Sequence, residues 1–326
     1  MKNLFKIISA IILLASCEDN RLDVDTSKTK INLVFNNHEQ DLFTTDQNKL
    51  EQKLDQWVLK YPPFINSESK NPANIYRLKD YLNNELNKKL WKDWQTQIGN
   101  YNTIKSDLES AFKHYRFYYP NDFIPPIYTY ISGLNYENPI SISQYGIIIG
   151  IDLFYGSNYQ PYRKLKIPKF ISQGFNKDFI APIVIRAFAK NRFSAFLSGK
   201  TMLDHMIGLG KIEYFIEAMI PKMTDSARFQ FTEKQMKWCY NHERAFWKHL
   251  TMKSLLFSKD LNAFKKYLQP GPFVSSLERD SPGRAGVYIG YKIVKEYMVR
   301  NPNITLNELM IDTDFNSIFT GAKYKP

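Results

Sequence analysis

The sequence predicts an α+β fold that is predominantly helical and contains one small β-sheet. Apolar residues recur at helical spacing through most of the chain, whereas β-branched and aromatic residues with glycine punctuation gather between residues 123 and 153. Hydrophobic residues make up 44% of the 326 residues, which is ample for a large buried core. No sharp shift of composition occurs beyond residue 30, so residues 30–326 are expected to form a single domain.

The first sixteen residues follow the order of a bacterial lipoprotein signal peptide. Lys2 and Lys6 precede an apolar run at residues 7–14, and Ala15-Ser16-Cys17 has the small residues of a lipobox. The apolar run is shorter than the roughly 20 residues that span a bilayer. We therefore predict that residues 1–16 are removed and that a diacylglycerol is attached to Cys17. The lipid would anchor the protein to the periplasmic face of the inner or the outer membrane.

Residues 17–29 are polar and lack an apolar period, so they are expected to form a short tether between the lipid and the fold. After cleavage Cys239 is the one other cysteine, which excludes an intramolecular disulfide. The net charge of +12 favours anionic neighbours such as phospholipid headgroups. We do not expect a nucleic-acid partner, because the chain has no nucleic-acid-binding signature and its leader exports it.

The N-terminal third is predicted to be mostly helical after one strand. Residues 30–35 alternate between polar and apolar as a strand does. Helical spacing then recurs in four segments, which are residues 45–59, 75–86, 90–98 and 103–114. Residues 123–131 and 145–153 are predicted to be two strands of the sheet. The proline-containing segment 156–173 is expected to be a surface connection.

Residues 182–215 are predicted to form a central hairpin of two helices joined at Ser198-Gly199. In the first helix, the apolar residues should pack inward while Arg186, Lys190 and Arg192 lie around the edge of that face. In the second helix, the residues expected in the core are Met202, Leu203, Met206, Ile207, Ile212, Phe215 and Ile216.

Three further helices are expected in the C-terminal third. Thr232 should cap a helix that runs towards Phe257, and two more helices are predicted over residues 287–299 and 306–310. Ser281-Pro282-Gly283-Arg284-Ala285-Gly286 precedes the second of these and can start a helix. Amide groups at a helix start and the guanidinium of Arg284 together favour a carboxylate. We expect an internal carboxylate in this place, with the carboxylate of a partner protein as the alternative.

The sequence lacks the common catalytic signatures. We find no glycine-rich phosphate loop, no nucleophile elbow and no pair of Cys-x-x-Cys knuckles. The segment His242-Glu243-Arg244-Ala245-Phe246 begins like the zinc helix His-Glu-x-x-His, but Phe246 occupies the second ligand position. His249 lies two turns beyond His242, which leaves a two-histidine option that we rank below an ordinary packing helix. We therefore expect neither a metal nor another cofactor.

Several segments together resemble one known family. They are Cys17, residues 149–156, residues 201–206 with 210–211 and 214–215, residues 281–286 with 289–290, and residues 323–326. In this order they are similar to the gliding-motility-associated lipoprotein GldB family of Bacteroidota. The resemblance implies an envelope lipoprotein that serves gliding motility and the coupled type IX secretion system, with other envelope proteins as partners and no established enzymatic activity. The chain departs from the family at Val34-Phe35-Asn36, where Arg-Phe-Asp is usual, and at His205, where an acidic residue is usual.

The family in turn resembles a group of zinc peptidases that place their ligands on a similar pair of helices. Leu209 stands where the third ligand would be, and the first helix has Arg186, Ala187, Lys190 and Asn191 but no histidine. Zinc needs at least three converging N, O or S ligands from the protein. The resemblance therefore implies a zincin-like scaffold without an intact His-Glu-x-x-His helix.

Two hypotheses about function follow. In the first, the protein is a non-catalytic binding or assembly component. Its candidate contact or structural residues are Arg284, Gly283, Gly286, Arg186, Asp204 and His205. In the second, it is a metal-dependent hydrolase whose rearranged ligands are Asp204, His205 and Glu213, with His242 as a possible fourth. We favour the first hypothesis, because adjacent residues such as Asp204 and His205 point apart on a helix.

Overall fold

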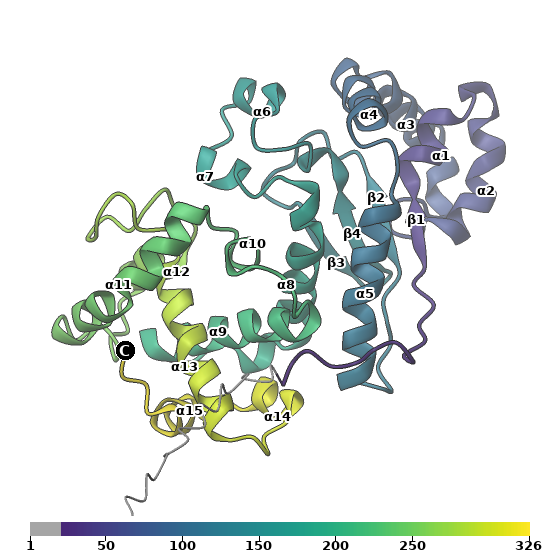
Figure 1. Cartoon of the computed structure of the whole chain (residues 1–326). Helices are drawn as coiled ribbons and strands as arrows, with labels where there is room; N and C mark the ends of the chain where they lie inside the picture. Colours follow the sequence, from purple (N-terminus) through teal and green to yellow (C-terminus); the bar gives the residue numbers. More distant parts are fainter. Residues whose placement is uncertain (1–20) are drawn as a thin grey trace, which may run out of the picture.

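A computed structural model of the chain describes residues 21–326 (Figure 1). The predicted signal peptide and Cys17 lie outside these residues. The described part is an α+β fold, mostly helical, with a single four-stranded sheet in strand order β1-β2-β4-β3. The predicted fold class is therefore confirmed.

The sheet is mainly parallel. Its strands are β1 (Phe35–Asn37), β2 (Ile127–Tyr130), β3 (Ile140–Ser143) and β4 (Gly146–Gly150). Strand β2 pairs in parallel with both β1 and β4, and β3 pairs antiparallel with β4. The strands predicted around residues 127 and 147 are confirmed. The prediction for residues 30–35 was wrong in position, because the ladder begins only at Phe35, and β3 was missed because its alternation covers only four residues.

The first four N-terminal helices lie at one end of the molecule, and the fifth runs beside the sheet towards the central hairpin (Figure 1). They are α1 (His38–Thr44), α2 (Leu50–Lys60), α3 (Pro72–Asn83), α4 (Glu85–Gln97) and α5 (Asn102–Tyr118). The four predicted helical segments correspond to α2 through α5. A small apolar core lies between α1 and α2 and includes Leu42, Leu50 and Trp57. Helix α5 contributes to the main core instead.

The central hairpin consists of α8 (Ile180–Arg192) and α9 (Met202–Met219), as predicted. Helix α9 is buried along nearly its whole length and crosses α13 (Ala285–Arg300) at very short range. A Cβ atom added to Gly290 of α13 would lie 1.8 Å from the carbonyl oxygen of Met206. One added to Gly210 would lie 2.3 Å from the carbonyl carbon of Gly290. The two helices therefore touch backbone against backbone, which only glycine permits at these positions.

Seven further helices complete the fold around this pair in the described chain. They are α6 (Gln160–Lys164), α7 (Lys169–Ser172), α10 (Asp225–Phe229), α11 (Glu233–Met252), α12 (Leu261–Leu268), α14 (Leu306–Ile311) and α15 (Phe315–Ala322). Thr232 caps α11 as predicted, in a reciprocal box with Gln235. The prediction of a plain surface connection at residues 156–173 was wrong. It forms α6 and α7, and the buried hydroxyl of Tyr162 donates to the carbonyl oxygen of Asp152 at 2.9 Å.

The segment predicted as a tether contacts the fold from Arg21 onward. The guanidinium of Arg21 donates to the carbonyl oxygens of Met298 at 2.9 Å and of Ile304 at 2.8 Å. The next side chain, Leu22, is buried in the main core. Between residues 21 and 326, none of the helices is both long and apolar enough to cross a membrane.

Candidate functional site

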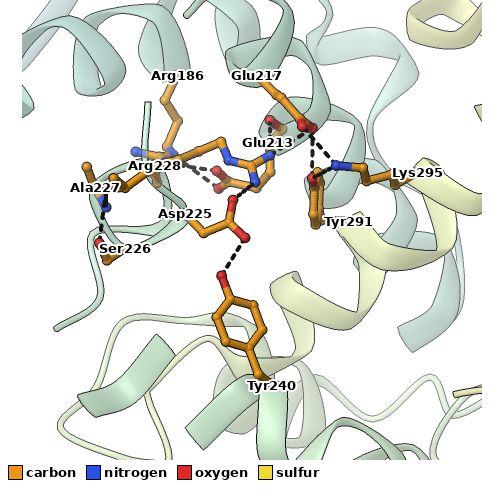
Figure 2. A network of polar contacts seen from close by, with 11 residues as sticks. Arg186, Glu213, Glu217, Asp225, Ser226, Ala227, Arg228, Tyr240, Tyr291 and Lys295 are labelled. Atoms are coloured by element: carbon orange, nitrogen blue, oxygen red, sulfur yellow. Dashed lines mark hydrogen bonds and ion pairs between the residues drawn. The ribbon is translucent and has the colours of Figure 1, made fainter. Parts of the chain in front are cut away.

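The candidate site is a polar network on the buried helix α9, shown in Figure 2. Glu213 and Glu217 lie one turn apart in this helix and therefore share one side of it. Both side chains are buried, and the residues around them in α9 are mostly apolar. Two buried carboxylates on an apolar helix need cationic partners, because an unpaired charge in the interior is very costly.

Glu213 is held by two arginines. Nε and Nη2 of Arg186 donate to its Oε1 at 3.2 Å and to its Oε2 at 2.8 Å. Nη2 of Arg284 donates to Oε1 at 3.0 Å. Burial alone would raise the pKa of Glu213, but the two guanidinium groups hold this pKa below its ordinary value. The carboxylate is therefore ionised, and both of its oxygens accept hydrogen bonds from the protein itself.

Arg186 extends from α8 into the core, so the prediction that it lies around the edge of the packed face was wrong. Its side chain is only 8% exposed. Besides Glu213 it contacts the C-terminal end of α10 (Asp225–Phe229). Nη1 donates to Oε1 of Gln230 at 3.1 Å, and Nη2 donates to the carbonyl oxygen of Arg228. These partners explain how a guanidinium can be buried at this position.

Arg284 stands immediately before α13, with a left-handed backbone at φ 64°. The helix begins at Ala285 rather than at Ser281. The side chain of Arg284 is 15% exposed, and burial together with the charge of Arg186 lowers the pKa of Arg284 to about 10. Its contact with Glu213 supplies the internal carboxylate that the sequence led us to expect.

The two glycines that flank Arg284 pack tightly. A Cβ atom on Gly283 would lie 2.3 Å from the carbonyl oxygen of Gly271. One on Gly286 would lie 2.8 Å from Cδ2 of Leu268 and 3.0 Å from the carbonyl oxygen of Tyr267. The glycines therefore allow the start of α13 to sit directly on α12 and on the loop after it, and this placement aims Arg284 at Glu213.

Glu217 belongs to the second half of the network (Figure 2). Nη1 of Arg228 donates to its Oε2 at 3.1 Å, and the hydroxyl of Tyr291 donates to the same oxygen at 2.7 Å. Nζ of Lys295 donates to Oε1 at 2.9 Å. Arg228 also pairs with Asp225, and its guanidinium lies 4.1 Å from the ring centroid of Tyr291. The network thus joins α9, α10 and α13 through one carboxylate.

The arrangement is better suited to holding helices together than to acid–base chemistry. Four cationic side chains, from Arg186, Arg228, Arg284 and Lys295, face three carboxylates, from Glu213, Glu217 and Asp225. A general base works best when its pKa is near the working pH. The lowered pKa of Glu213 makes it a weak base.

The other residues singled out from the sequence lie in separate surroundings. Oδ2 of Asp204 accepts from the amides of Lys200 at 2.8 Å and Thr201 at 2.9 Å, and so caps α9. The ring of His205 lies against Phe264, at 4.6 Å between centroids.

His242 likewise has a packing role. It stacks on Trp238 at 4.8 Å, and its Nδ1 lies 3.0 Å from the carbonyl oxygen of Trp238. Among residues 21–326, no three His, Cys, Asp or Glu side chains are grouped so that they could hold a metal ion. The rearranged ligand set considered for a hydrolase is therefore not brought together in the described chain.

A buried carboxylate outside this network, that of Glu39 in α1, has the opposite electrostatics. Its Oε1 accepts from the hydroxyls of Tyr101 and, at 2.8 Å, of Thr129, and no cation neutralises it among the interactions described. Burial raises the pKa of Glu39 to about 7. Sequence analysis passed over this residue, because a glutamate near a helix start normally faces solvent.

Five further residues of the network were not predicted from the sequence, namely Glu217, Asp225, Arg228, Tyr291 and Lys295. Glu213 and Glu217 lie one turn apart among mostly apolar residues, and this spacing was a usable signal for a buried polar pair. The spacing of Asp225 and Arg228 carried no such signal, because acidic and basic residues three apart are common on exposed helices.

Comparison with known proteins adds one finding. The family model described as gliding motility protein GldB matches residues 19–326, which is nearly the whole chain. No curated protein and no solved structure gives a match. The protein therefore belongs to the GldB family of gliding motility proteins.

Proposed function

We propose that the protein is a lipid-anchored component of the cell envelope that supports gliding motility and the type IX secretion system, as a non-catalytic binding or assembly protein. Membership of the GldB family supports the link to motility. The lipobox at Cys17 supports attachment through an N-terminal lipid, and the residues that follow the predicted tether fold into a helical body without a spanning helix between residues 21 and 326.

The proposal of a non-catalytic role rests on the hydrogen bonds that the Glu213 carboxylate accepts. This residue lies on the central hairpin, where the resemblance to zinc peptidases would place the chemistry. Both carboxylate oxygens are occupied by Arg186 and Arg284. A catalytic glutamate has to be free to bind a metal or a water molecule, whereas this one stabilises the packing of α8, α9 and α13.

The function is tested by complementing a strain that lacks its own copy of the gene. We expect Cys17→Ala to retain its leader, to lose the lipid and to fail to restore colony spreading and type IX secretion. Cys239→Ala is the matched control, because it changes the other cysteine, which is buried far along the chain in α11. This control should be processed and functional. A Cys17→Ala protein that is processed, membrane-bound and motile would contradict the proposal.

A metal measurement separates the proposal from a hydrolase with rearranged ligands. We expect protein purified without chelator to contain no stoichiometric zinc, because zinc sites need three or more protein ligands that converge. Asp204, His205 and His242 each have other partners, as does Glu213. Elemental analysis of the purified protein checks this expectation. One tightly held zinc per chain would instead support the hydrolase and direct attention to His205 and His242.

A further inference from the structure

The segment nearest the predicted lipid is fixed to the fold at Arg21. Its guanidinium donates to the carbonyl oxygen of Met298, near the end of α13, and to that of Ile304, just before α14. Carbonyls at a helix C-terminus lack partners within the helix and attract cations. The guanidinium of Arg21 therefore supplies both a hydrogen-bond donor and a positive charge. Leu22 then enters the core. The described chain therefore starts at a defined point on the surface.

The distance from this point to the lipid is short. Arg21 lies four positions after Cys17, and an extended chain spans at most about 14 Å over four residue steps. A lipid on Cys17 would therefore hold the α13 and α14 region within about 14 Å of the point of attachment, whatever path the intervening residues take. The segment between Cys17 and Arg21 is too short for the fold to turn another face toward the bilayer.

We propose that the face around Arg21, formed by the end of α13, the start of α14 and the segment at residues 21–23, lies against the membrane that carries the lipid. This inference rests on the proposed lipidation of Cys17. It adds an orientation, because the helices α2 and α3 at the far end of the molecule then point away from the bilayer (Figure 1).

This face combines an apolar pocket with exposed side chains of both charges. Beside Arg21 lies a pocket of about 210 Å³, whose lining includes the apolar or aromatic side chains of Leu22, Tyr118, Tyr214, Met298 and Leu306. Val299, the residue after the Met298 carbonyl to which Arg21 donates, has an exposed side chain. The amino group of Lys222 lies 4.0 Å from Asp23 and is highly exposed. Apolar side chains mixed with cationic ones are typical of surfaces that rest in the headgroup region.

The test measures how close two surface positions come to the bilayer. The full-length lipidated protein is reconstituted into vesicles of phosphatidylethanolamine and phosphatidylglycerol that contain a spin-labelled headgroup lipid. A fluorophore is attached at Val299→Cys or at Leu59→Cys, whose native side chains are 59% and 86% exposed. Cys239 is buried and Cys17 carries the lipid, so each variant has one reactive thiol. Leu59 lies in α2, at the opposite end of the molecule (Figure 1).

We expect the nitroxide to quench the label at position 299 several-fold more strongly than the label at position 59. In the double variant Arg21→Ala, Leu22→Ser the fold should be free to tumble on its lipid, and quenching at position 299 should fall towards the value at position 59. Equal quenching at the two positions, or no effect of the double variant, would overturn the orientation alone. Flotation of the vesicles is scored separately. Protein that does not float with them would overturn the lipidation and the orientation together.

Discussion

Replacing Glu213 with glutamine is expected to lower the free energy of unfolding by roughly 3–5 kcal/mol, which is the usual cost of removing one partner from a buried ion pair. The variant would leave the guanidinium groups of Arg186 and Arg284 facing each other without a counter-charge. We expect a much lower urea midpoint and a lower yield of soluble protein. Arg284→Ala should lower the free energy of unfolding by a smaller amount, because Arg186 still faces Glu213 in that variant.

Glu39→Gln is the matched control, since it changes another buried glutamate in the same way. The pKa of Glu39 is raised to about 7, above the ordinary 4.5. Its folded state therefore binds the proton more tightly than the unfolded state, and the resulting stability is lost as the pH rises from about 4.5 through 7. At pH 8 Glu39→Gln removes an unpaired buried charge, so the variant should be as stable as the wild type or more so.

The pH dependence of the Glu213 variant has the opposite sign. Because the pKa of Glu213 is lowered in the fold, its ion pair contributes stability above the unfolded pKa, and this contribution is lost as the pH falls through the folded pKa. The difference in unfolding free energy between wild type and Glu213→Gln should therefore be greatest near pH 7 and should decrease as the pH falls. Equal losses for the glutamine variants of Glu213 and Glu39 at pH 8 would show that the network is not what stabilises α9.

Gly290→Ala is expected to have the second large effect and to lower the free energy of unfolding by about 3 kcal/mol or more. Overpacking a core usually costs roughly 1–3 kcal/mol and sometimes more, and a clash with backbone belongs at the upper end. The added methyl would meet the backbone of Met206 at 1.8 Å from its oxygen, and no rotamer change can relieve that clash. In an isolated helix the same change would stabilise by about 0.8–1 kcal/mol. The sign of the measured effect therefore distinguishes tight helix crossing from simple helix propensity.

Gly271→Ala serves as the control for this experiment. The nearest atom to its Cβ position is the carbonyl oxygen of Phe273 at 3.7 Å, an ordinary contact distance. Its unfolding free energy should stay within about 0.5 kcal/mol of the wild type, as for most surface changes. Urea denaturation of both variants provides the comparison. If Gly290→Ala were as stable as Gly271→Ala, α9 and α13 could not be in backbone contact.

The sequence was most informative where local spacing determines structure. The core residues of α9, such as Leu203, Met206 and Phe215, recur at helical spacing, and all of them are buried as predicted. The cap at Thr232 depends on residues within one turn and was also predictable. In contrast, α10, α12 and α15 were not predicted. Thr224, Asp260 and Asp314 cap their first turns, but each helix has eight residues or fewer, and an apolar pattern of that length does not identify a helix on its own.

The candidate site depends on contacts between distant segments, and this is why sequence analysis recovered only part of it. Arg186 has no local feature that distinguishes it from a solvent-exposed arginine, and its carboxylate partner lies 27 residues further on. Arg284 was recognised because Gly283 and Gly286 mark a tight turn around it, but its partner Glu213 is 71 residues earlier. Periodicity describes which side of a helix is apolar, and it does not say which distant charge will reach that side.

The crossing of Gly210 and Gly290 has a consequence for how the protein opens. Two helices in backbone contact cannot separate by rotating single side chains, so exposing the face of α9 that meets α13 requires α13 to leave as a whole. That departure also removes Arg284 from Glu213 and both Tyr291 and Lys295 from Glu217. The amides of α9 and α13 therefore belong to one cooperative unit for hydrogen exchange, although more than 60 residues of chain lie between the two helices.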